Sequence, residues 1–280
     1  MTPDTPAAII PTPATPSSPA AFYNTLASSY DRMVGFETRR QQAGRFVARL
    51  LERFDPVRAT GIDLGCGTGA FACALAAAGF PAAGLDLADD MLAQARANAA
   101  RLGLDVRFSS GCLEALPQPY PPRSAGLVLC LGNTLPHLLD PADLERAFAG
   151  IAALLAPGGL AVIQTLNYDR ILARQERIVS VDRDDDATFL RFYDFLDDGL
   201  LRFNLLRVAW EGSEARPAPL ISVPLRPYRC QDLAASARLA GLEVALAAGA
   251  ADLSPYDAAT SDTILLALRP TLGDTAAGVV

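Results

Sequence analysis

The sequence has no lysine, since all 24 of its basic residues are arginine. A phosphate-binding P-loop and Schiff-base chemistry both depend on a lysine amine, so both are excluded. Acidic residues outnumber basic ones, 31 to 24, which gives a net charge of -7 and a pI near 4.8. A chain of this charge has no general positive field that attracts nucleic acid, and we predict no nucleic-acid partner.

Cysteine and long apolar runs are also scarce. The five cysteines are odd in number and lack C-x-x-C spacing, which argues against a disulfide framework or a zinc site. We therefore predict no metal and a reducing, cytoplasmic environment. No apolar run reaches the ~18 residues of a membrane-spanning helix. The first basic residue is Arg32, so the charged N-terminal segment that a signal peptide requires is missing. We predict no membrane association.

The two ends of the chain differ in composition from the rest. Residues 1–19 carry six prolines among Thr, Ser and Ala, which predicts a disordered tail. Residues 271–280 are predicted to be a flexible C-terminal tail. A single folded domain is expected over residues 20–270, with a ligand-binding core at 56–168 and inserted strands at about 175–228.

Within this domain, apolar runs alternate with alanine-rich helical segments, a pattern typical of βαβ units and a parallel sheet. Two amphipathic helices are expected first, at 23–33 and 37–54. The predicted strands of the sheet lie at 61–64, 82–87, 106–109, 127–131, 160–166, 242–246 and 263–268, and the helices between them at 70–78, 89–102, 141–155 and 231–240. Extended segments at 188–210 and 222–228, around the turn 197–199, predict antiparallel strands beside the sheet. The acidic run 182–186 is interpreted as a solvated loop.

A glycine-rich turn follows the first predicted strand of the sheet. The residues Gly65-Cys-Gly-Thr-Gly69 stand between a strand and a helix, where a ligand can approach bare backbone at a helix N-terminus. The turn also matches, loosely, the dinucleotide-binding fingerprint G-x-G-x-x-G/A, with Ala70 at the position of the third glycine. Asp63 favours a different ligand, because its carboxylate would repel a pyrophosphate but suits a ligand with a sulfonium and an ammonium group.

The next predicted strand ends at a second carboxylate. Asp86 is placed to accept hydrogen bonds from both hydroxyls of a ribose, and Met91 to pack against an adenine face. A ligand-free glycine turn, with Asp86 as a simple helix cap, is the alternative interpretation.

These motifs resemble those of class I S-adenosylmethionine (SAM)-dependent methyltransferases. The resemblance covers about residues 22–268 and rests on Gly61-Ile-Asp-Leu-Gly-Cys-Gly-Thr-Gly69, Gly84-Leu-Asp-Leu87 with Met91-Leu92, and Pro157-Gly-Gly159. Two further segments resemble glycine N-methyltransferase-like enzymes, namely Cys130-Leu-Gly-Asn-Thr-Leu-Pro-His-Leu138 and Asn167-Tyr-Asp-Arg-Ile-Leu172. The family implies a Rossmann-like, seven-stranded, mostly parallel α/β sheet with helices on both faces and an antiparallel insertion that helps to form the acceptor pocket.

The resemblance also implies a set of SAM-binding residues. Its members surround the methionyl, ribose and adenine parts of SAM and are Tyr30, Arg40, Asp63, Gly65, Cys66, Gly67, Asp86, Leu87, Met91, Cys112, Leu113 and Leu131. Arg39 is as good a candidate as Arg40 for the methionine carboxylate. Relatives commonly have Asp or Asn where Cys112 stands, so the contact to the adenine amine is weaker here or comes from backbone.

Asn133 and His137 are the predicted catalytic residues facing the methyl donor. His137 is the only histidine, and a structural role for it is the alternative. Glycine N-methyltransferase has an arginine directly before its Asn-Tyr-Asp motif that grips the substrate carboxylate, whereas this chain has Leu166.

The predicted function is SAM-dependent methyl transfer to a nitrogen or oxygen of a small-molecule acceptor by in-line displacement. An NAD(P)-dependent oxidoreductase and a non-catalytic SAM-binding protein are the alternatives.

Overall fold

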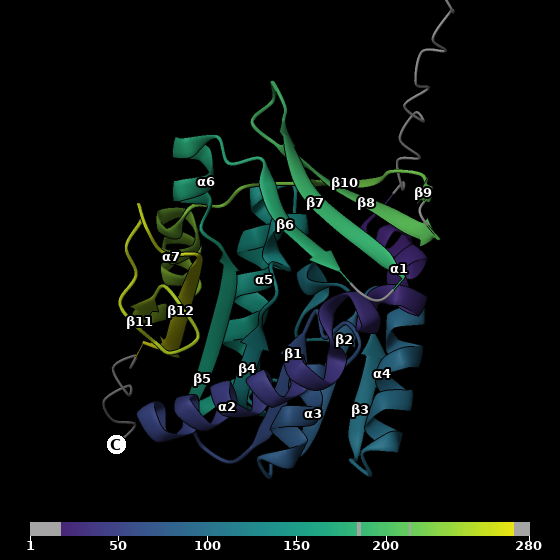
Figure 1. Cartoon of the computed structure of the whole chain (residues 1–280). Helices are drawn as coiled ribbons and strands as arrows, with labels where there is room; N and C mark the ends of the chain where they lie inside the picture. Colours follow the sequence, from purple (N-terminus) through teal and green to yellow (C-terminus); the bar gives the residue numbers. More distant parts are fainter. Residues whose placement is uncertain (1–17, 184–185, 213, 272–280) are drawn as a thin grey trace, which may run out of the picture.

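The computed structural model describes residues 18–183, 186–212 and 214–271. Its main sheet has seven strands in the order β11-β12-β5-β4-β1-β2-β3 (Figure 1). These are β1 (Thr60–Leu64), β2 (Ala82–Asp86), β3 (Val106–Ser110), β4 (Ala125–Cys130), β5 (Leu155–Leu166), β11 (Leu242–Ala248) and β12 (Thr263–Pro270). Strands β1 to β5 pair in parallel, and β12 runs antiparallel to both of its neighbours. The predicted mostly parallel α/β sheet is confirmed.

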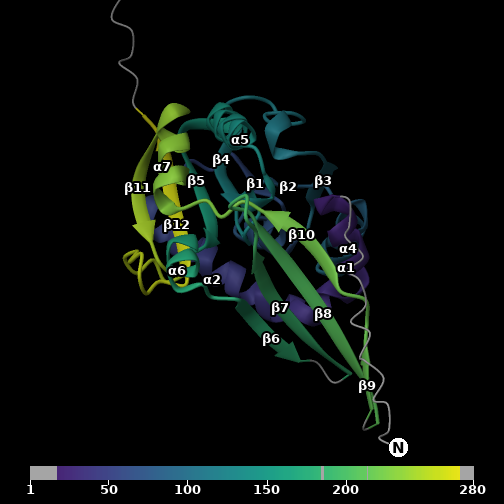
Figure 2. The same cartoon turned by 90° about the horizontal axis from the view of Figure 1, so that it is seen from above.

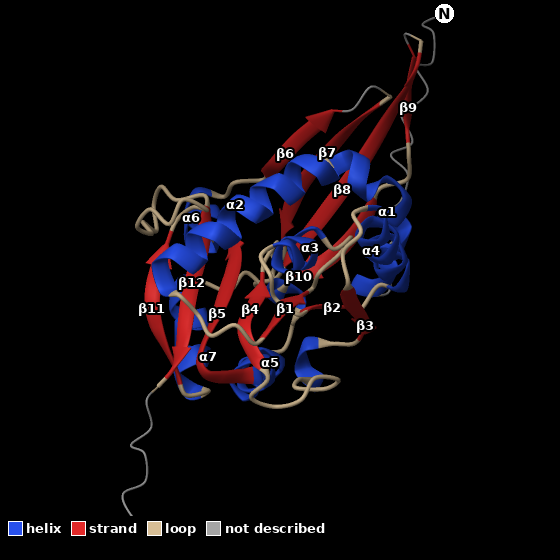
Figure 3. Cartoon of the chain, turned by 90° about the horizontal axis from the view of Figure 1, so that it is seen from below, coloured by secondary structure: helices blue, strands red, loops and turns tan. Residues whose placement is uncertain are grey.

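Helices cover both faces of this sheet, as Figure 3 shows. On one face lie α2 (Phe36–Phe54) and α3 (Ala70–Ala77), and on the other lie α5 (Pro141–Leu154) and α7 (Cys230–Leu239). Alternate residues of the central strands point into the two cores: Ile62 packs on the α5 side, and Leu127 and Leu129 pack on the α2 side. Helix α4 (Asp89–Arg101) packs against β2 and β3.

The segment between β5 and α7 forms a separate antiparallel sheet, seen from above in Figure 2. Its strands are β6 (Ile178–Arg183), β7 (Ala187–Phe195), β8 (Leu201–Glu211) and β10 (Ile221–Leu225), in the order β10-β8-β7-β6, with β9 (Glu214–Pro217) on β8. The short helix α6 (Tyr168–Arg174) leads into it. The backbone N–H of Cys230, where the chain returns to α7, donates to Asp169 Oδ2 of α6 at 3.1 Å, so the two ends of the insertion are joined.

Helix α1 (Pro19–Val34) connects the two sheets. Its buried residues Phe22 and Leu26 form one apolar cluster with Met91 of α4 and with Phe189 and Leu205 of the antiparallel sheet. The helix therefore closes the space between the ligand-binding core and the insertion. In the described ranges, no helix has the length and apolar character to cross a membrane.

Helix α1 begins at Pro19 and is capped by the Ser18 hydroxyl. Of the two predicted tails, residues 1–17 and 272–280 lie outside the described residues. The structure corrects the expectation for one local segment. Asp182 belongs to strand β6, where it pairs with Phe189 of β7, and not to a solvated loop. Its carboxylate accepts a hydrogen bond from Arg191 on that neighbouring strand.

Candidate active site

The glycine turn after β1 lines a cavity of about 240 Å³, which we call the loop cavity. Gly65, Gly67 and Gly69 all have positive φ (69°, 51° and 87°), a backbone conformation that side chains disfavour. A Cβ on Gly65 would overlap the Thr134 side chain, whereas a Cβ on Gly67 would enter open space. Because Gly65 and Gly67 carry no side chains, a ligand can reach the backbone of the turn at these two positions.

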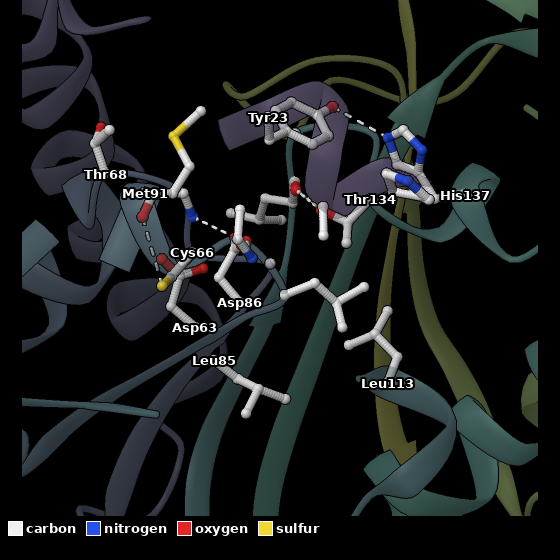
Figure 4. Close-up of a pocket in the computed structure, with 18 of the residues that line it drawn as sticks. Tyr23, Asp63, Cys66, Thr68, Leu85, Asp86, Met91, Leu113, Thr134 and His137 are labelled. Carbon is white, nitrogen blue, oxygen red and sulfur yellow. Dashed lines mark hydrogen bonds between the residues drawn. The ribbon is translucent and has the colours of Figure 1, made fainter. Parts of the chain in front are cut away.

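Two carboxylates face this cavity from the ends of β1 and β2 (Figure 4). Asp86 accepts hydrogen bonds from the backbone N–H groups of Gly67 (2.8 Å, to Oδ2) and Ala88 (2.9 Å, to Oδ1), which hold it in place. Asp63 is almost fully buried and accepts from the N–H of Ala72 at 3.1 Å. Burial raises the pKa of Asp63 to about 7, against the opposing charge of Arg39, and burial also raises the pKa of Asp86. The cavity is therefore suited to a ligand that brings positive charge to Asp63 and hydroxyl donors to Asp86.

Apolar side chains form another wall of the loop cavity. Met91 and Leu113 are buried there, Leu131 lies at the end of β4, and Leu87 is partly exposed at the rim. Cys112 does not line the cavity; it precedes the 3-10 turn Leu113–Ala115. The residues after β3 that do line the loop cavity are Gly111, Leu113 and Glu114.

Of the two candidate arginines, Arg39 lines the loop cavity and Arg40 does not. Arg40 points away on α2, where its guanidinium pairs with Glu37 one turn earlier. Arg39 lines the cavity and lies over the Phe71 ring at 5.8 Å. It makes no ion pair with any described residue, so its charge is available to an anionic group of a ligand.

A second cavity of about 470 Å³, here called the aromatic cavity, lies against the inner face of the antiparallel sheet. Its lining is mainly apolar and aromatic and comes from α1, from Leu166 at the end of β5, and from residues of the insertion such as Tyr193, Phe203 and Leu205. The two cavities adjoin, because both are lined by Tyr23, Tyr30, Arg39, Phe71, Gly132 and His137.

Tyr23 and His137 form a hydrogen-bonded pair in this shared wall (Figure 4). Tyr23 Oη and His137 Nε2 are 3.0 Å apart, and the two rings meet edge to face. Burial lowers the pKa of His137 to about 4 and raises the pKa of Tyr23 far above its usual range. Both side chains are therefore uncharged at neutral pH. Nδ1 of His137 is buried and has no hydrogen-bond partner among the described residues.

Asn133 lines only the aromatic cavity, and its amide is engaged within the protein. Its Oδ1 accepts from the N–H of Leu166 at 3.0 Å, and its Nδ2 donates to the hydroxyl of Tyr168 at 2.8 Å. Asn133 adopts φ 70°, a left-handed conformation that asparagine tolerates better than most residues. It thus ties the turn after β4 to the end of β5 and to α6.

Tyr23 and Thr134 line the loop cavity but were not among the residues predicted from the sequence. Tyr23 lies on a helix whose spacing predicted only an amphipathic cover, and periodicity does not reveal which polar side chain faces a cavity. Thr134, whose hydroxyl donates to the Leu131 carbonyl at 2.8 Å, closes the glycine turn from the opposite side. The only sign of this contact in the sequence is the glycine at position 65, which allows the Thr134 side chain to pack against bare backbone.

Comparison with known proteins agrees with this arrangement. Residues 61–159 match a family described as a methyltransferase domain. A glycine/sarcosine N-methyltransferase of Parasynechococcus marenigrum is 30% identical over 54% of this chain and 52% of its own length. A ubiquinone biosynthesis O-methyltransferase of Methylococcus capsulatus is 37% identical over 38% of this chain and 43% of its own length. The solved CcbJ methyltransferase of Streptomyces caelestis is 25% identical, with a TM-score of 0.73 over 89% of this chain and 98% of its own.

Residues 61–159 therefore form a methyltransferase domain, within a fold similar to that of a solved methyltransferase. The chain spans about half of the length of the first of these curated relatives, and less of the second.

The described residues fit SAM. Bare backbone at Gly65 and Gly67, a buried carboxylate at Asp63 and an unpaired guanidinium at Arg39 match the zwitterionic, sulfonium-bearing methionyl part. Asp86 retains lone pairs for ribose hydroxyls.

Proposed function

We propose that the whole chain is a SAM-dependent methyltransferase that methylates an amine nitrogen of a small molecule. The observation that carries this proposal is the wall shared by the loop cavity and the aromatic cavity, with the uncharged Tyr23–His137 pair in it. A donor in the first cavity and an acceptor in the second would meet at this wall.

When bound, SAM would supply a methyl group attached to a sulfonium. The acceptor nitrogen would form a bond to the methyl carbon in line with the carbon–sulfur bond, which breaks and leaves the sulfur as a neutral thioether. The protein has to hold the nitrogen about 3 Å from that carbon and exclude water. Tyr23 and His137 provide hydrogen-bonding atoms at the shared wall that orient the acceptor N–H and leave its lone pair free. The methylated nitrogen then releases a proton to solvent.

The protonation state of the pair favours an amine over a hydroxyl acceptor. With a pKa of about 4, His137 is too weak a base to remove the proton of an alcohol or phenol at neutral pH. An amine needs no such base, because its neutral form is already nucleophilic. Asn133 is assigned a positioning role, since both polar atoms of its amide hold Leu166 and Tyr168.

The test is to incubate the full chain and SAM with matched amines and alcohols on the same carbon skeletons, and to measure S-adenosylhomocysteine release and product mass. Amines are expected to gain one methyl group, and kcat/KM is expected to rise with pH along the titration of the acceptor ammonium, with no inflection from His137 between pH 5 and 8. Tyr23→Phe should lower kcat/KM about tenfold. Tyr120→Phe is the matched control, since Tyr120 lines neither cavity.

Preferential turnover of the alcohols would contradict the amine assignment. SAM binding without turnover on any acceptor would favour a non-catalytic binding protein, and calorimetric binding of NAD but not SAM would favour an oxidoreductase. A cytoplasmic location remains a prediction, supported by the five free cysteines.

A further inference from the structure

The aromatic cavity contains a polar site on strand β7 that the methyl-transfer chemistry does not use. Arg191 and Tyr193 are two residues apart, so their side chains lie on the same face of the strand, and both line the cavity. Their cross-strand neighbours on β8 are Leu205 and Phe203, which are also cavity-lining. The polar groups are thus set into an apolar surface.

Arg191 is held from one side only. Its Nε donates to Ser180 Oγ at 2.6 Å and its Nη2 to Asp182 Oδ2 at 2.7 Å, while Ser180 donates to the same Asp182 oxygen at 2.7 Å. Nη1 makes no hydrogen bond with any residue in the described ranges. Ser180 and Asp182 therefore fix the guanidinium and leave one of its nitrogens to a ligand.

Tyr193 adds a second free donor. Its side chain is 1% exposed, and its hydroxyl has no hydrogen-bond partner of normal geometry among the described residues. Burial raises the pKa of Tyr193 to about 12, and the neighbouring Tyr168 hydroxyl and the charge of Arg191 oppose this shift. The hydroxyl thus stays protonated at neutral pH, and Tyr193 lies on the same face of β7 as Arg191. A buried polar group without a partner is costly unless a ligand satisfies it.

We infer that Arg191 and Tyr193 form a carboxylate-binding subsite, and that the methyl acceptor is an amine with an apolar or aromatic body and a carboxylate. This inference rests on the proposed function, since it names the acceptor class of the same site. The charge of the cavity supports it: Arg39 and Arg191 line the cavity, and no Asp or Glu among the described residues does so. A volume of about 470 Å³ exceeds the needs of a free small amino acid and falls within the range for larger organic ligands.

The probe is a carboxylate that cannot be methylated. Phenylacetate, 3-phenylpropanoate and 4-phenylbutanoate, each paired with its neutral amide, are titrated by calorimetry into the full chain saturated with S-adenosylhomocysteine. At least one acid should bind ~10- to 100-fold more tightly than its amide. Arg191→Leu should remove that preference, and Tyr193→Phe should reduce it several-fold.

Arg202→Leu is the matched control and should retain the preference. Arg202 is on the adjacent strand, pairs with Asp194 and lines neither cavity. S-adenosylhomocysteine affinity, measured for every variant, reports that the fold and the loop cavity are intact.

Equal affinity for acids and amides, no binding of any acid, or a preference that survives Arg191→Leu would overturn the inference. These outcomes do not depend on turnover, so they are distinct from failure of the proposed function, which would appear as acid binding without methylation of any amine. A second arm compares phenylalanine with 2-phenylethylamine as acceptors, and kcat/KM should favour phenylalanine in the wild type and lose that preference in Arg191→Leu.

Discussion

At the scale of single residues, the Asp86 carboxylate is fixed by backbone groups on both of its oxygens. Each carboxylate oxygen already accepts one backbone hydrogen bond, from Gly67 or from Ala88. An ionised carboxylate has about four acceptor positions, so both oxygens can accept again from a ribose. The residue therefore stabilises the glycine turn before the ligand arrives.

Replacing Asp86 with Ala should weaken SAM binding by ~1.5–3 kcal/mol, because charge-assisted hydrogen bonds to ribose are lost. Isothermal titration with SAM measures the effect. Asp89→Ala, which removes an exposed carboxylate from the first turn of α4 outside the cavity, is the control and should change little. Unchanged affinity in a folded Asp86→Ala protein would refute the ribose assignment.

Asp63 predicts a pH dependence of SAM binding. Its pKa is raised to about 7, so between about pH 4 and 7 the folded protein keeps a proton that the unfolded chain has lost, and this contribution to stability disappears as pH rises through 7. A cationic ligand beside Asp63 favours the ionised form. SAM affinity should therefore increase from pH 6 to 8.

Titration at pH 7 in buffers with different ionisation enthalpies should detect proton release on SAM binding. Asp63→Asn should abolish this release, and its melting temperature should vary less with pH over the same range. Buffer-independent enthalpies for the wild type would contradict the linkage.

At the scale of elements, the end of β5 contributes an apolar residue to the wall of the aromatic cavity. Leu166 lines the aromatic cavity with an apolar side chain, and its N–H is fixed by Asn133. No cation therefore extends from this position toward a short acceptor. The carboxylate-binding arginine inferred above lies instead on β7, beyond an apolar surface that glycine has no side chain to cover.

Free glycine should accordingly be a poor substrate. Without an arginine at position 166, a loss on the order of 2–4 kcal/mol in transition-state binding corresponds to a roughly thirtyfold to thousandfold lower kcat/KM than for a larger amine. S-adenosylhomocysteine release with glycine, sarcosine and bulkier amines measures it. Leu166→Arg should narrow the gap, and efficient turnover of glycine by the wild type would show that this reading of β5 is wrong.

The sequence predicted the cavity residues at the ends of the parallel strands better than those on the two N-terminal helices. Gly65 to Gly69, Asp63 and Asp86 lie at ends of parallel strands, where local spacing alone brings them to one edge of the sheet. Tyr23 could not be found this way, because its partner His137 is distant in sequence and meets it only when α1 packs across the sheet. Arg39 and Arg40 are adjacent on one helix, so only its rotation distinguishes them.

At the scale of the whole molecule, the acidic net charge argues against a nucleic-acid acceptor. The net charge is -7, and the two unpaired or half-paired arginines of the site lie in the cavities.

We therefore expect no measurable binding of duplex DNA or of single-stranded RNA, with any Kd weaker than ~10⁻⁴ M at physiological salt. Fluorescence anisotropy with labelled oligonucleotides checks this, with and without S-adenosylhomocysteine. Salt-sensitive binding at micromolar concentrations would contradict the assignment of a small-molecule acceptor.

The hydrogen bond between Cys230 and Asp169 closes the inserted sheet at its base, so the chain leaves the methyltransferase core and returns to it at one point. A segment anchored in this way can be exchanged as a cassette. The residues that line the loop cavity all precede residue 168, whereas the cassette adds Val179, Arg191, Tyr193, Phe203, Leu205 and Leu225 to the wall of the aromatic cavity. Grafting the corresponding segment of a relative between these two anchors is a direct route to an enzyme that keeps its methyl donor and changes its product.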